Sequence, residues 1–374
     1  MSFKCHELKD NLLAIYKEDT FTIRICNIDK CRLVQYLHCP ETIRSVLSTP
    51  DATTLIVTFR HIDTIQIWQQ VDHVSVSSSL FSFCSSNVSD GGDHFFHLAH
   101  TLPCTSGKCG LLSDEQLLTY HEYAEENKFA LRIWNIKTKK EPTKTITISN
   151  RISYDILVLA SDLIAYTTND AAHTIHLINL STEHTTYVRE SAKWYALLKL
   201  STNLLAYKFD EEYLIYKLDE KKRLDCSFLF EHGRIEKFSN VNNTTSLVAA
   251  LVCLECEDRP KKYSIRLFNV STLIPSHNIF QLDGEANYFS KLQISQHLLM
   301  NCRGPTTLIW NIESGLLILN MEHSTWIENA LLSSNEEFFS FLENTGHIQV
   351  LSRETGVSQG KGEFVCSSFC RQCS

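Results

Sequence analysis

One short segment recurs along the chain and constrains its fold more than any other feature. It alternates apolar and polar positions and often closes on an aromatic residue followed by asparagine, as in residues 64–68 and 130–135. This alternation is typical of a β-strand and not of a helix. The closing positions are Cys26, Trp68, Trp134, Ile178, Tyr216, Phe268, Trp310 and Leu351. Their spacings of 42, 66, 44, 38, 52, 42 and 41 residues indicate a repeated structural unit.

Each closing segment is flanked by further segments of strand composition. An apolar run precedes it, such as residues 54–58, 163–166 or 247–254, and other short runs lie before and after the pair. Four strands in each of eight units give about 47 residues per unit, which is typical of a propeller blade. The sequence therefore predicts an all-β fold, a single closed β-propeller of four-stranded blades, with eight blades preferred over seven.

The 66-residue spacing indicates an insertion at about residues 71–109, after the third strand of the second blade. Its first part is rich in serine, which is typical of a surface excursion. The predicted propeller covers residues 1–365, and residues 366–374 are a cysteine-bearing tail. Cys366, Cys370 and Cys373 in this tail are a weak candidate metal site, with packed or unstructured thiols as the alternative.

Composition excludes several classes of function. Only 12 of the 374 residues are glycine, and the glycine-rich loops of dinucleotide-binding and phosphate-binding folds are absent. The net charge of −8 argues against a nucleic-acid partner, which requires a basic surface. No apolar run approaches the ~20 residues of a membrane span, and the N-terminus lacks a signal-peptide core. We therefore expect a cytoplasmic, unsecreted protein whose 14 cysteines are reduced thiols.

The repeated segments resemble those of WD40-repeat propellers. Residues 131–135 and 308–311 look like the third strand of that family, with asparagine where the family has aspartate. Residues 43–55 are similar to its first strand and following turn, and residues 321–323 look like a degenerate Gly-His dipeptide. We expect no repeat to keep the family's buried Asp-His-Ser/Thr-Trp network. The expected structural anchors of the third strands are Cys26, Trp68, Trp134, Phe268 and Trp310.

The resemblance also carries an expectation about function, because propellers of this family almost always bind other proteins. It implies a non-catalytic scaffold or adaptor that binds protein partners across the top face and central channel. Two alternatives stay open: an enzyme propeller of the hydrolase or lyase type, and a substrate-receptor subunit of a ubiquitin ligase that lacks its own F-box. The sequence contains no hydrolase nucleophile motif and no metal-binding histidine pair, so we expect no catalytic residues and no cofactor.

Charge is distributed unevenly over the predicted loops. Turns between second and third strands share the top face with the connections between blades, and turns between third and fourth strands lie on the bottom face. The candidate binding residues of the top face are Glu18, Asp19, Glu125, Glu126, Asp170, Asp210, Glu211, Glu212 and Glu343. The basic bottom loops contain Lys137, Lys139, Lys140, Lys221, Lys222 and Arg223. An acidic top would steer basic protein segments, and an ordinary solvated surface is the alternative.

Overall fold

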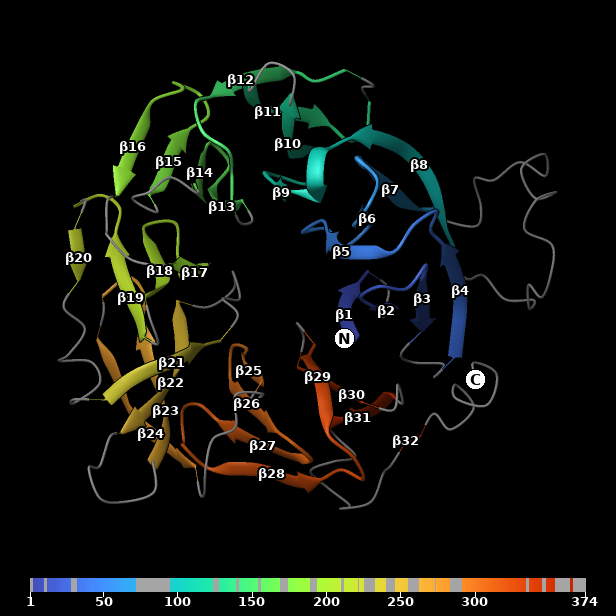
Figure 1. Ribbon diagram of the computed structural model, residues 1–374. Helices are drawn as coiled ribbons and strands as arrows, with labels where there is room; N and C mark the ends of the chain where they lie inside the picture. The colour runs from blue at the N-terminus through green and yellow to red at the C-terminus, as the bar shows by residue number, and fades with distance from the viewer. Residues whose placement is uncertain are drawn as a thin grey trace. The chain divides into compact units, whose positions relative to one another are not determined.

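The described part of the chain consists of β-strands arranged in two compact units that divide after Ile148. The computed structural model describes residues 3–9, 12–27, 32–71, 95–123, 128–138, 141–153, 156–168, 174–188, 194–209, 212–220, 222–224, 233–239, 246–254, 262–272, 274–282, 291–333, 336–344, 348–353 and 364–365. Unit 1 contains the first three four-stranded sheets and unit 2 the following five (Figure 1).

Each sheet is an antiparallel meander, in which every strand pairs with its neighbour in sequence. Blades 1 to 3 are β1 (Phe3–Leu8), β2 (Leu12–Lys17), β3 (Thr22–Asn27) and β4 (Arg32–His38); β5 (Ile43–Ser48), β6 (Thr54–Phe59), β7 (Thr64–Val71) and β8 (Phe95–Pro103); β9 (Cys109–Leu111), β10 (Gln116–Tyr123), β11 (Lys128–Asn135) and β12 (Lys144–Ile148). Blades 4 to 6 are β13 (Leu157–Ala160), β14 (Leu163–Thr167), β15 (Ile175–Asn179) and β16 (Thr185–Val188); β17 (Trp194–Lys199), β18 (Leu204–Phe209), β19 (Glu212–Lys217) and β20 (Lys222–Leu224); β21 (Gly233–Phe238), β22 (Leu247–Leu254), β23 (Lys262–Asn269) and β24 (Pro275–Leu282). Blades 7 and 8 are β25 (Lys291–Ile294), β26 (Leu298–Arg303), β27 (Thr306–Asn311) and β28 (Leu317–Glu322); β29 (Ile327–Leu332), β30 (Phe338–Glu343), β31 (Ile348–Ser352) and β32 (Phe364–Val365). The prediction of an all-β propeller with eight four-stranded blades is confirmed.

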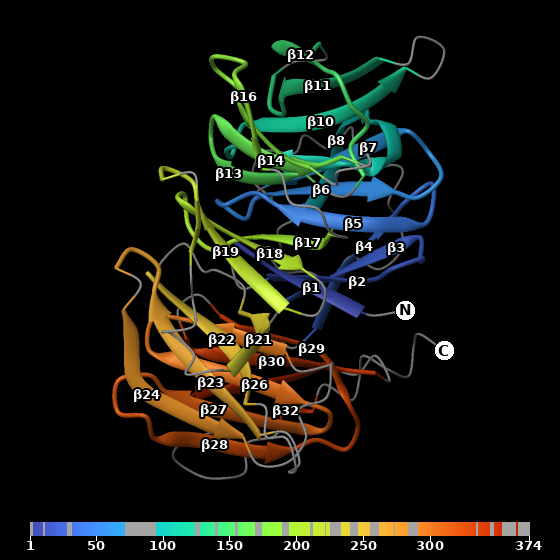
Figure 2. The ribbon, with the colours of Figure 1, turned by 60° about the vertical axis from the view of Figure 1, so that its left-hand side comes forward.

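The hydrophobic core lies between successive blades, not within a single sheet. One buried cluster joins blades 1 and 2 and another joins blades 2 and 3, and in unit 2 each adjacent pair of blades shares a cluster of its own. Blades 6 and 7 lie face to face in this way (Figure 2). Burial of apolar side chains between sheets is the main stabilising contribution to such a fold.

The second strand of a blade is covered on both faces, which explains its continuous apolar sequence. In β22, Val248, Ala250 and Val252 contact the cluster shared with blade 5. Ala249 and Leu251 contact the cluster shared with blade 7. A strand buried on both faces needs no polar positions, so its sequence is a continuous apolar run instead of an alternation.

The anchor residues lie in third strands, and at four of the five, Trp134 being the exception, the pairing with the fourth strand changes register. Cys26, Trp134, Phe268 and Trp310 are buried, and Trp68 is half-buried. Register shifts occur between Ile25 and Cys26, Ile67 and Trp68, Arg266 and Phe268, and Ile309 and Trp310. A shift of this kind bends the strand and increases its twist. The large or polarisable side chains of the repeat therefore mark the point where the outer half of the blade bends.

The asparagine that follows the anchor caps the turn between the third and fourth strands. Asn135 Oδ1 accepts hydrogen bonds from the backbone N–H groups of Lys137 and Thr138, both at 3.0 Å. Asn179 and Asn269 make the same pair of contacts in blades 4 and 6. A short side-chain carbonyl that reaches two or three residues ahead is the reason asparagine favours turns. Asparagine therefore supplies the oxygen that aspartate would supply at this position.

Two glutamine side chains bind the backbone of the next blade. Gln35 on β4 donates from Nε2 to the Phe96 carbonyl and accepts from the Phe96 N–H, both at 2.8 Å. Gln293 on β25 donates to the Ala330 carbonyl at 2.6 Å and accepts from the Leu332 N–H at 2.8 Å. Phe96 lies on β8, the outermost strand of blade 2, and Ala330 and Leu332 lie on β29, the first strand of blade 8. These two contacts, the glutamine clamps, join adjacent blades within unit 1 and within unit 2.

Part of the predicted insertion at residues 71–109 is regular structure. Phe95–Pro103 is β8, which pairs with β7 and supplies the fourth strand of blade 2. A 3-10 turn, η3 (Thr105–Gly107), then leads into β9, the first strand of blade 3. Strand β8 contains three polar residues and a terminal proline and lacks the regular alternation that marks the third strands. The serine-rich run, residues 74–89, lies outside the described residues.

Candidate functional site

The turns between second and third strands lie at the same edge of the blades as the connections from one blade to the next. In unit 1 the Asp19 N–H donates to the Ile43 carbonyl at 3.1 Å, and the Ile43 N–H donates to the Thr20 carbonyl at 2.8 Å. Asp19 and Thr20 belong to the β2–β3 turn, whereas Ile43 begins the following blade. We call this the top edge of a blade. The opposite edge, with the turns between third and fourth strands, is the bottom edge.

The acidic residues predicted for the top face do not form one exposed cluster among the described residues. Glu18 is ion-paired with Lys4, and Asp19 with Arg60. Glu343 is buried at 7% exposure and therefore adds no exposed charge. Glu212 is the first residue of β19. The other predicted acids lie outside the described residues: Glu125, Glu126, Asp170, Asp210 and Glu211.

The basic residues predicted for the bottom face are also only partly described. Lys137 is exposed in the β11–β12 turn, with its Nζ 3.4 Å from Glu115 Oε1. Lys222 and Arg223 belong to the short strand β20. Lys139, Lys140 and Lys221 lie outside the described residues, as do Cys366, Cys370 and Cys373. Within the described ranges no three His, Cys, Asp or Glu side chains are grouped to hold a metal ion. No helix of the described chain has the length and apolar character needed to cross a membrane.

An exposed tryptophan lies at the top edge of unit 2, between blades 7 and 8. Trp326 is 49% exposed and belongs to the connection from β28 to β29, residues 323–327, which we call the Trp326 segment. Its backbone is held at three points. The His323 N–H donates to the Pro305 carbonyl at 2.7 Å, and the Ile327 N–H donates to the Gly304 carbonyl at 2.9 Å. The Trp326 carbonyl accepts from the Asn344 N–H at 2.9 Å.

The side chains on either side of Trp326 hold the segment further. Ser324 Oγ and Thr325 Oγ1 both donate to the Glu343 carboxylate, at 3.3 and 2.9 Å. The indole lies next to Gly304, whose φ of +58° favours glycine, and a Cβ built there would be 4.0 Å from Trp326 Cε2. Glu343 was predicted as an exposed binding residue, but here it is a buried acceptor that positions the segment.

His323, the first residue of the Trp326 segment, is held by side chains of blades 7 and 8. Its Nε2 lies 2.8 Å from Thr307 Oγ1 on β27, and its Nδ1 lies 3.0 Å from Gln349 Oε1 on β31. Its ring packs on Phe341 at 4.8 Å between centroids. Burial lowers the pKa of His323, while the Gln349 contact and the nearby Glu343 act in the opposite direction. The degenerate Gly-His dipeptide of the sequence thus supplies a histidine that joins blade 7 to blade 8.

Sequence reasoning missed Trp326 as a functional residue, although one signal was available. Of the five tryptophans, Trp68, Trp134, Trp194 and Trp310 lie within strands. Trp326 alone among the five belongs to a connection between blades. A tryptophan in a connection lies outside the alternation that marks the core positions of the strands, and here it is half-exposed.

The comparisons with known proteins identify the fold. The sequence matches no protein-family profile and no curated protein. The C-terminal WD40 domain of Sif2 superposes with a TM-score of 0.58 at 12% identity, covering 94% of this chain and 95% of that domain. Sqt1 of Saccharomyces cerevisiae gives 0.57 at 12% identity, covering 93% and 94%. The dihydro-heme d1 dehydrogenase NirN gives 0.59 at 8% identity, covering 98% of this chain and 80% of that one.

Identities this low show the fold alone, and the activity of NirN does not transfer to this chain. The Sif2 structure is described as a WD40 domain, and Sqt1 superposes on this chain over nearly its whole length. The eroded third strands and the eight four-stranded blades agree with them. The chain is therefore a divergent propeller with the fold of WD40 domains.

Proposed function

We propose that the protein is a non-catalytic interaction scaffold that binds a protein partner at the top edge of blades 7 and 8, with Trp326 as the anchor. The observation that carries the proposal is a half-exposed indole on a connection held by backbone hydrogen bonds at three positions. Tryptophan is the residue type most enriched at the energetic centres of protein interfaces. Because the segment is already ordered, a partner would lose little free energy in fixing it on binding.

The polar groups around Trp326 favour a binding role over a catalytic one. Glu343 contacts the segment and His323 begins it, and both side chains are buried and engaged in hydrogen bonds that hold it. An active site usually presents a titratable group to a cavity, where burial and charge adjust its pKa for the reaction. The Trp326 segment instead presents an apolar ring, which is the arrangement expected of an interaction surface.

The state of the described cysteines supports a cytoplasmic location for this scaffold. The seven that the structure describes form no disulfide with one another. Burial raises the pKa of Cys39, Cys104 and Cys302 to about 12, so these thiols are protonated and unreactive. Buried thiols that serve as small apolar side chains are typical of proteins from reducing compartments.

Affinity purification from cells that produce the protein, followed by mass spectrometry, tests the proposal. Trp326→Ala should reduce recovery of at least one specific partner tenfold or more. Tyr187→Ala is the matched control, since Tyr187 is an equally exposed aromatic residue on β16 of the same unit. Equal recovery with the wild type and the Trp326 variant, at unchanged thermal stability, would overturn the proposal. So would recovery of no partner above an unrelated bait protein.

A further inference from the structure

The bottom edge of blades 6 and 7 carries two exposed apolar side chains at one equivalent position. In each turn between third and fourth strands the asparagine N–H donates to the carbonyl five residues later. Asn269 donates to Ile274 at 3.0 Å, and Asn311 donates to Leu316 at 2.9 Å. In blade 4 the equivalent carbonyl is that of His184, an exposed polar residue. The turn geometry therefore does not require an apolar side chain here.

Ile274 and Leu316 are 63% and 68% exposed, more than any other large apolar residue of the described chain. One further residue of this kind, Leu317, follows Leu316 at the start of β28, whereas Ile279 lies in the middle of β24. Three of the ten exposed large apolar side chains therefore belong to this one edge. Exposed apolar residues that gather in this way mark interaction surfaces in soluble proteins.

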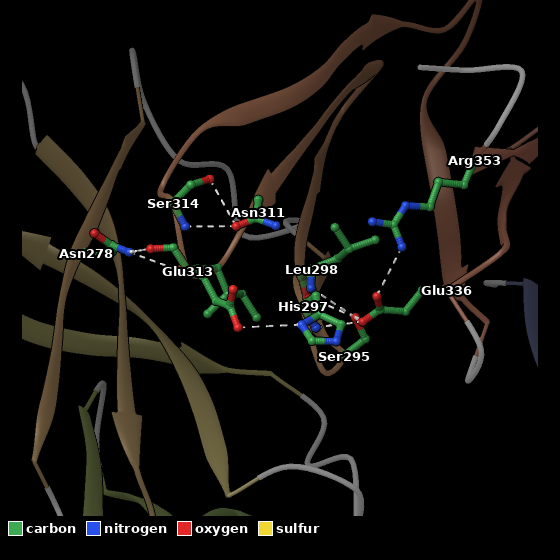
Figure 3. Close-up of polar contacts among 10 residues, drawn as sticks. Asn278, Ser295, His297, Leu298, Asn311, Glu313, Ser314, Glu336 and Arg353 are labelled. Carbon is green, nitrogen blue, oxygen red and sulfur yellow. Dashed lines mark hydrogen bonds and ion pairs between the residues drawn. The ribbon is translucent and has the colours of Figure 1, made fainter. Parts of the chain in front are cut away.

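The turn that carries Leu316 is bound to the outermost strand of blade 6 by Asn278 of β24. Its Nδ2 donates to the Ile312 carbonyl at 2.7 Å and to the Glu313 carbonyl at 3.1 Å (Figure 3). Gly315 has a φ of +69°, and a Cβ built there would be 3.4 Å from Asn278 Cγ. Close approach of the Asn278 side chain to this turn therefore favours glycine. These contacts hold the turn with Leu316 against β24, the strand that follows Ile274 directly.

Blade 8 also supports this edge. A buried carboxylate of blade 8 binds the turn between β25 and β26, and that turn contacts Ile312. Glu336 is 4% exposed, and its Oε1 accepts from Ser295 Oγ and, at 2.7 Å, from the His297 N–H. Its Oε2 lies 3.5 Å from Arg353 Nη1. The His297 carbonyl in turn accepts from the Ile312 N–H at 2.8 Å. Figure 3 shows this continuous set of contacts, which fixes the edge before any partner binds.

Charge at this edge indicates the chemistry of the partner. Glu313 lies between the capping Asn311 and the exposed Leu316, and its side chain is 79% exposed. Its Oε1 is 3.9 Å from His297 Nδ1. An exposed carboxylate beside apolar side chains is complementary to an apolar segment that also carries a lysine or arginine.

We propose that Ile274, Leu316 and Leu317, with Glu313 at their rim, form a second docking surface for a protein segment that combines apolar and basic side chains. This surface is distinct from the Trp326 segment, because the two lie at opposite ends of β28. Six residues of strand separate them, a length of roughly 20 Å. The inference goes beyond the proposed function, since a chain with both surfaces binds two partners at once and bridges them.

Selection of random 16-residue peptides displayed on phage, with the full-length protein as the target, tests this surface. Enriched peptides should contain clustered apolar residues and at least one lysine or arginine. Leu316→Ser and Ile274→Ser should each weaken binding of a synthetic copy of such a peptide at least tenfold, and Glu313→Gln about threefold. Trp326→Ala and Leu98→Ser, a change at an exposed leucine of blade 2, should leave binding unchanged.

Three results would overturn the inference. They are the absence of enriched peptides, enrichment of acidic peptides, and binding that both serine variants leave intact while their melting temperatures match the wild type. Sedimentation of the purified protein adds a fourth, because a concentration-dependent dimer abolished by Leu316→Ser identifies a second copy as the occupant. The insensitivity to Trp326→Ala separates failure of this surface from failure of the proposed top-edge site.

Discussion

Blades 3 and 7 each contain a buried threonine–histidine contact, but the two blades use it for different purposes. In blade 3 the Trp134 indole N–H donates to Thr119 Oγ1 at 2.7 Å, and Thr119 Oγ1 lies 2.8 Å from His121 Nε2. All three residues belong to β10 and β11 of that blade. In blade 7 the partner of Thr307 is His323, which lies beyond the blade and also contacts Gln349 of blade 8.

The environment of the histidine in blade 3 favours a neutral ring. An indole N–H only donates, so Thr119 Oγ1 accepts from Trp134. A neutral His121 with its proton on Nδ1 can accept the Thr119 O–H at Nε2, 2.8 Å away. Burial, with a smaller effect of Arg132, lowers the pKa of His121 to about 4, which agrees with this assignment.

In blade 7 the histidine proton lies on Nδ1, the ring nitrogen that contacts Gln349. Gln349 Oε1 only accepts, so His323 Nδ1 donates to it, and Nε2 of the neutral ring lies 2.8 Å from Thr307 Oγ1, which is also 3.3 Å from the Cys302 thiol. Trp310 takes no part, and its ring instead packs on Phe280 of blade 6 at 5.5 Å between centroids. The comparison shows that the same pair of residue types closes one blade on itself in blade 3 and joins two blades at blade 7.

Thr119→Val gives the largest expected effect and tests the self-contained network. It leaves the Trp134 indole N–H and His121 Nε2 buried without this partner, which should cost about 3 kcal/mol in the free energy of unfolding. Thr307→Val should cost about half as much, since His323 keeps its contact with Gln349. Urea unfolding of both variants measures the difference. Equal losses would show that the two networks contribute alike.

The pH dependence of stability should distinguish the two histidines. The folded-state pKa of about 4 for His121 lies below the ordinary value of 6.5, so the unfolded chain takes up its proton first as the pH falls. This contribution is complete above pH 6.5 and decreases towards pH 4, by about 2 kcal/mol after allowance for solvent screening. His6, whose pKa burial also lowers to about 4, adds a loss of the same sign.

His121→Gln should therefore flatten the decline of the urea midpoint between pH 6.5 and 4. His323→Gln should flatten it less, because Gln349 and Glu343 partly offset the effect of burial on the pKa of His323. The reverse order of the two variants would contradict the assignment of the neutral ring in blade 3.

The contact between blades 7 and 8 can also be weakened at the bottom edge, through Glu336, while His323 is left unchanged. Glu336→Ala removes the acceptor for Ser295 Oγ and the His297 N–H and should cost about 2 kcal/mol. Glu336→Gln keeps a carbonyl oxygen at that position and should cost about 1 kcal/mol or less. Hydrogen exchange of the His297 amide provides the readout. An unchanged exchange rate in the alanine variant would show that the junction does not depend on this contact.

The smallest effect is expected at the asparagine that caps the turn between the third and fourth strands, a feature that blades 3 and 7 share. Asn135→Ala and Asn311→Ala each remove two hydrogen bonds that cap an exposed turn. Each should cost about 1 kcal/mol in thermal or urea unfolding. Replacement of either asparagine by aspartate, which retains the acceptor oxygen, should cost less than about 0.5 kcal/mol. A marked difference between the two alanine variants would show that the turns are not equivalent.

The blade pattern was accessible from the sequence because it depends on local periodicity. Third strands close on Trp134, Phe268 or Trp310, and their alternating sequence reflects burial on one face. Second strands such as β22 are buried on both faces, and their sequences are therefore continuous apolar runs. Strand β8 was not predicted, since its three polar residues and terminal proline leave no regular alternation. The three-residue network of blade 3 was also missed, because its histidine comes from the second strand and not from a Gly-His dipeptide.

The candidate sites were less accessible, since exposure depends on contacts between distant segments. Nothing in the sequence near Glu343 shows that Ser324 and Thr325 bury it, and nothing near Leu316 shows that Asn278 fixes its turn. The acidic top edge stays a prediction, since Glu125, Glu126, Asp170, Asp210 and Glu211 lie outside the described residues. The charge pattern also gave no sign of Trp326 and Leu316, which are apolar and exposed.

The glutamine clamps have a consequence for how the protein behaves in a crowded solution. An edge strand presents N–H and carbonyl groups to which a strand of another chain can add, which is the first step of many aggregates. A glutamine side chain carries the same donor and acceptor as a peptide unit, and Gln35 and Gln293 occupy such groups on β8 and β29. Each clamp thus occupies one N–H and one carbonyl of such a strand with a side chain of the neighbouring blade, so an added strand could pair at that point only by displacing the glutamine.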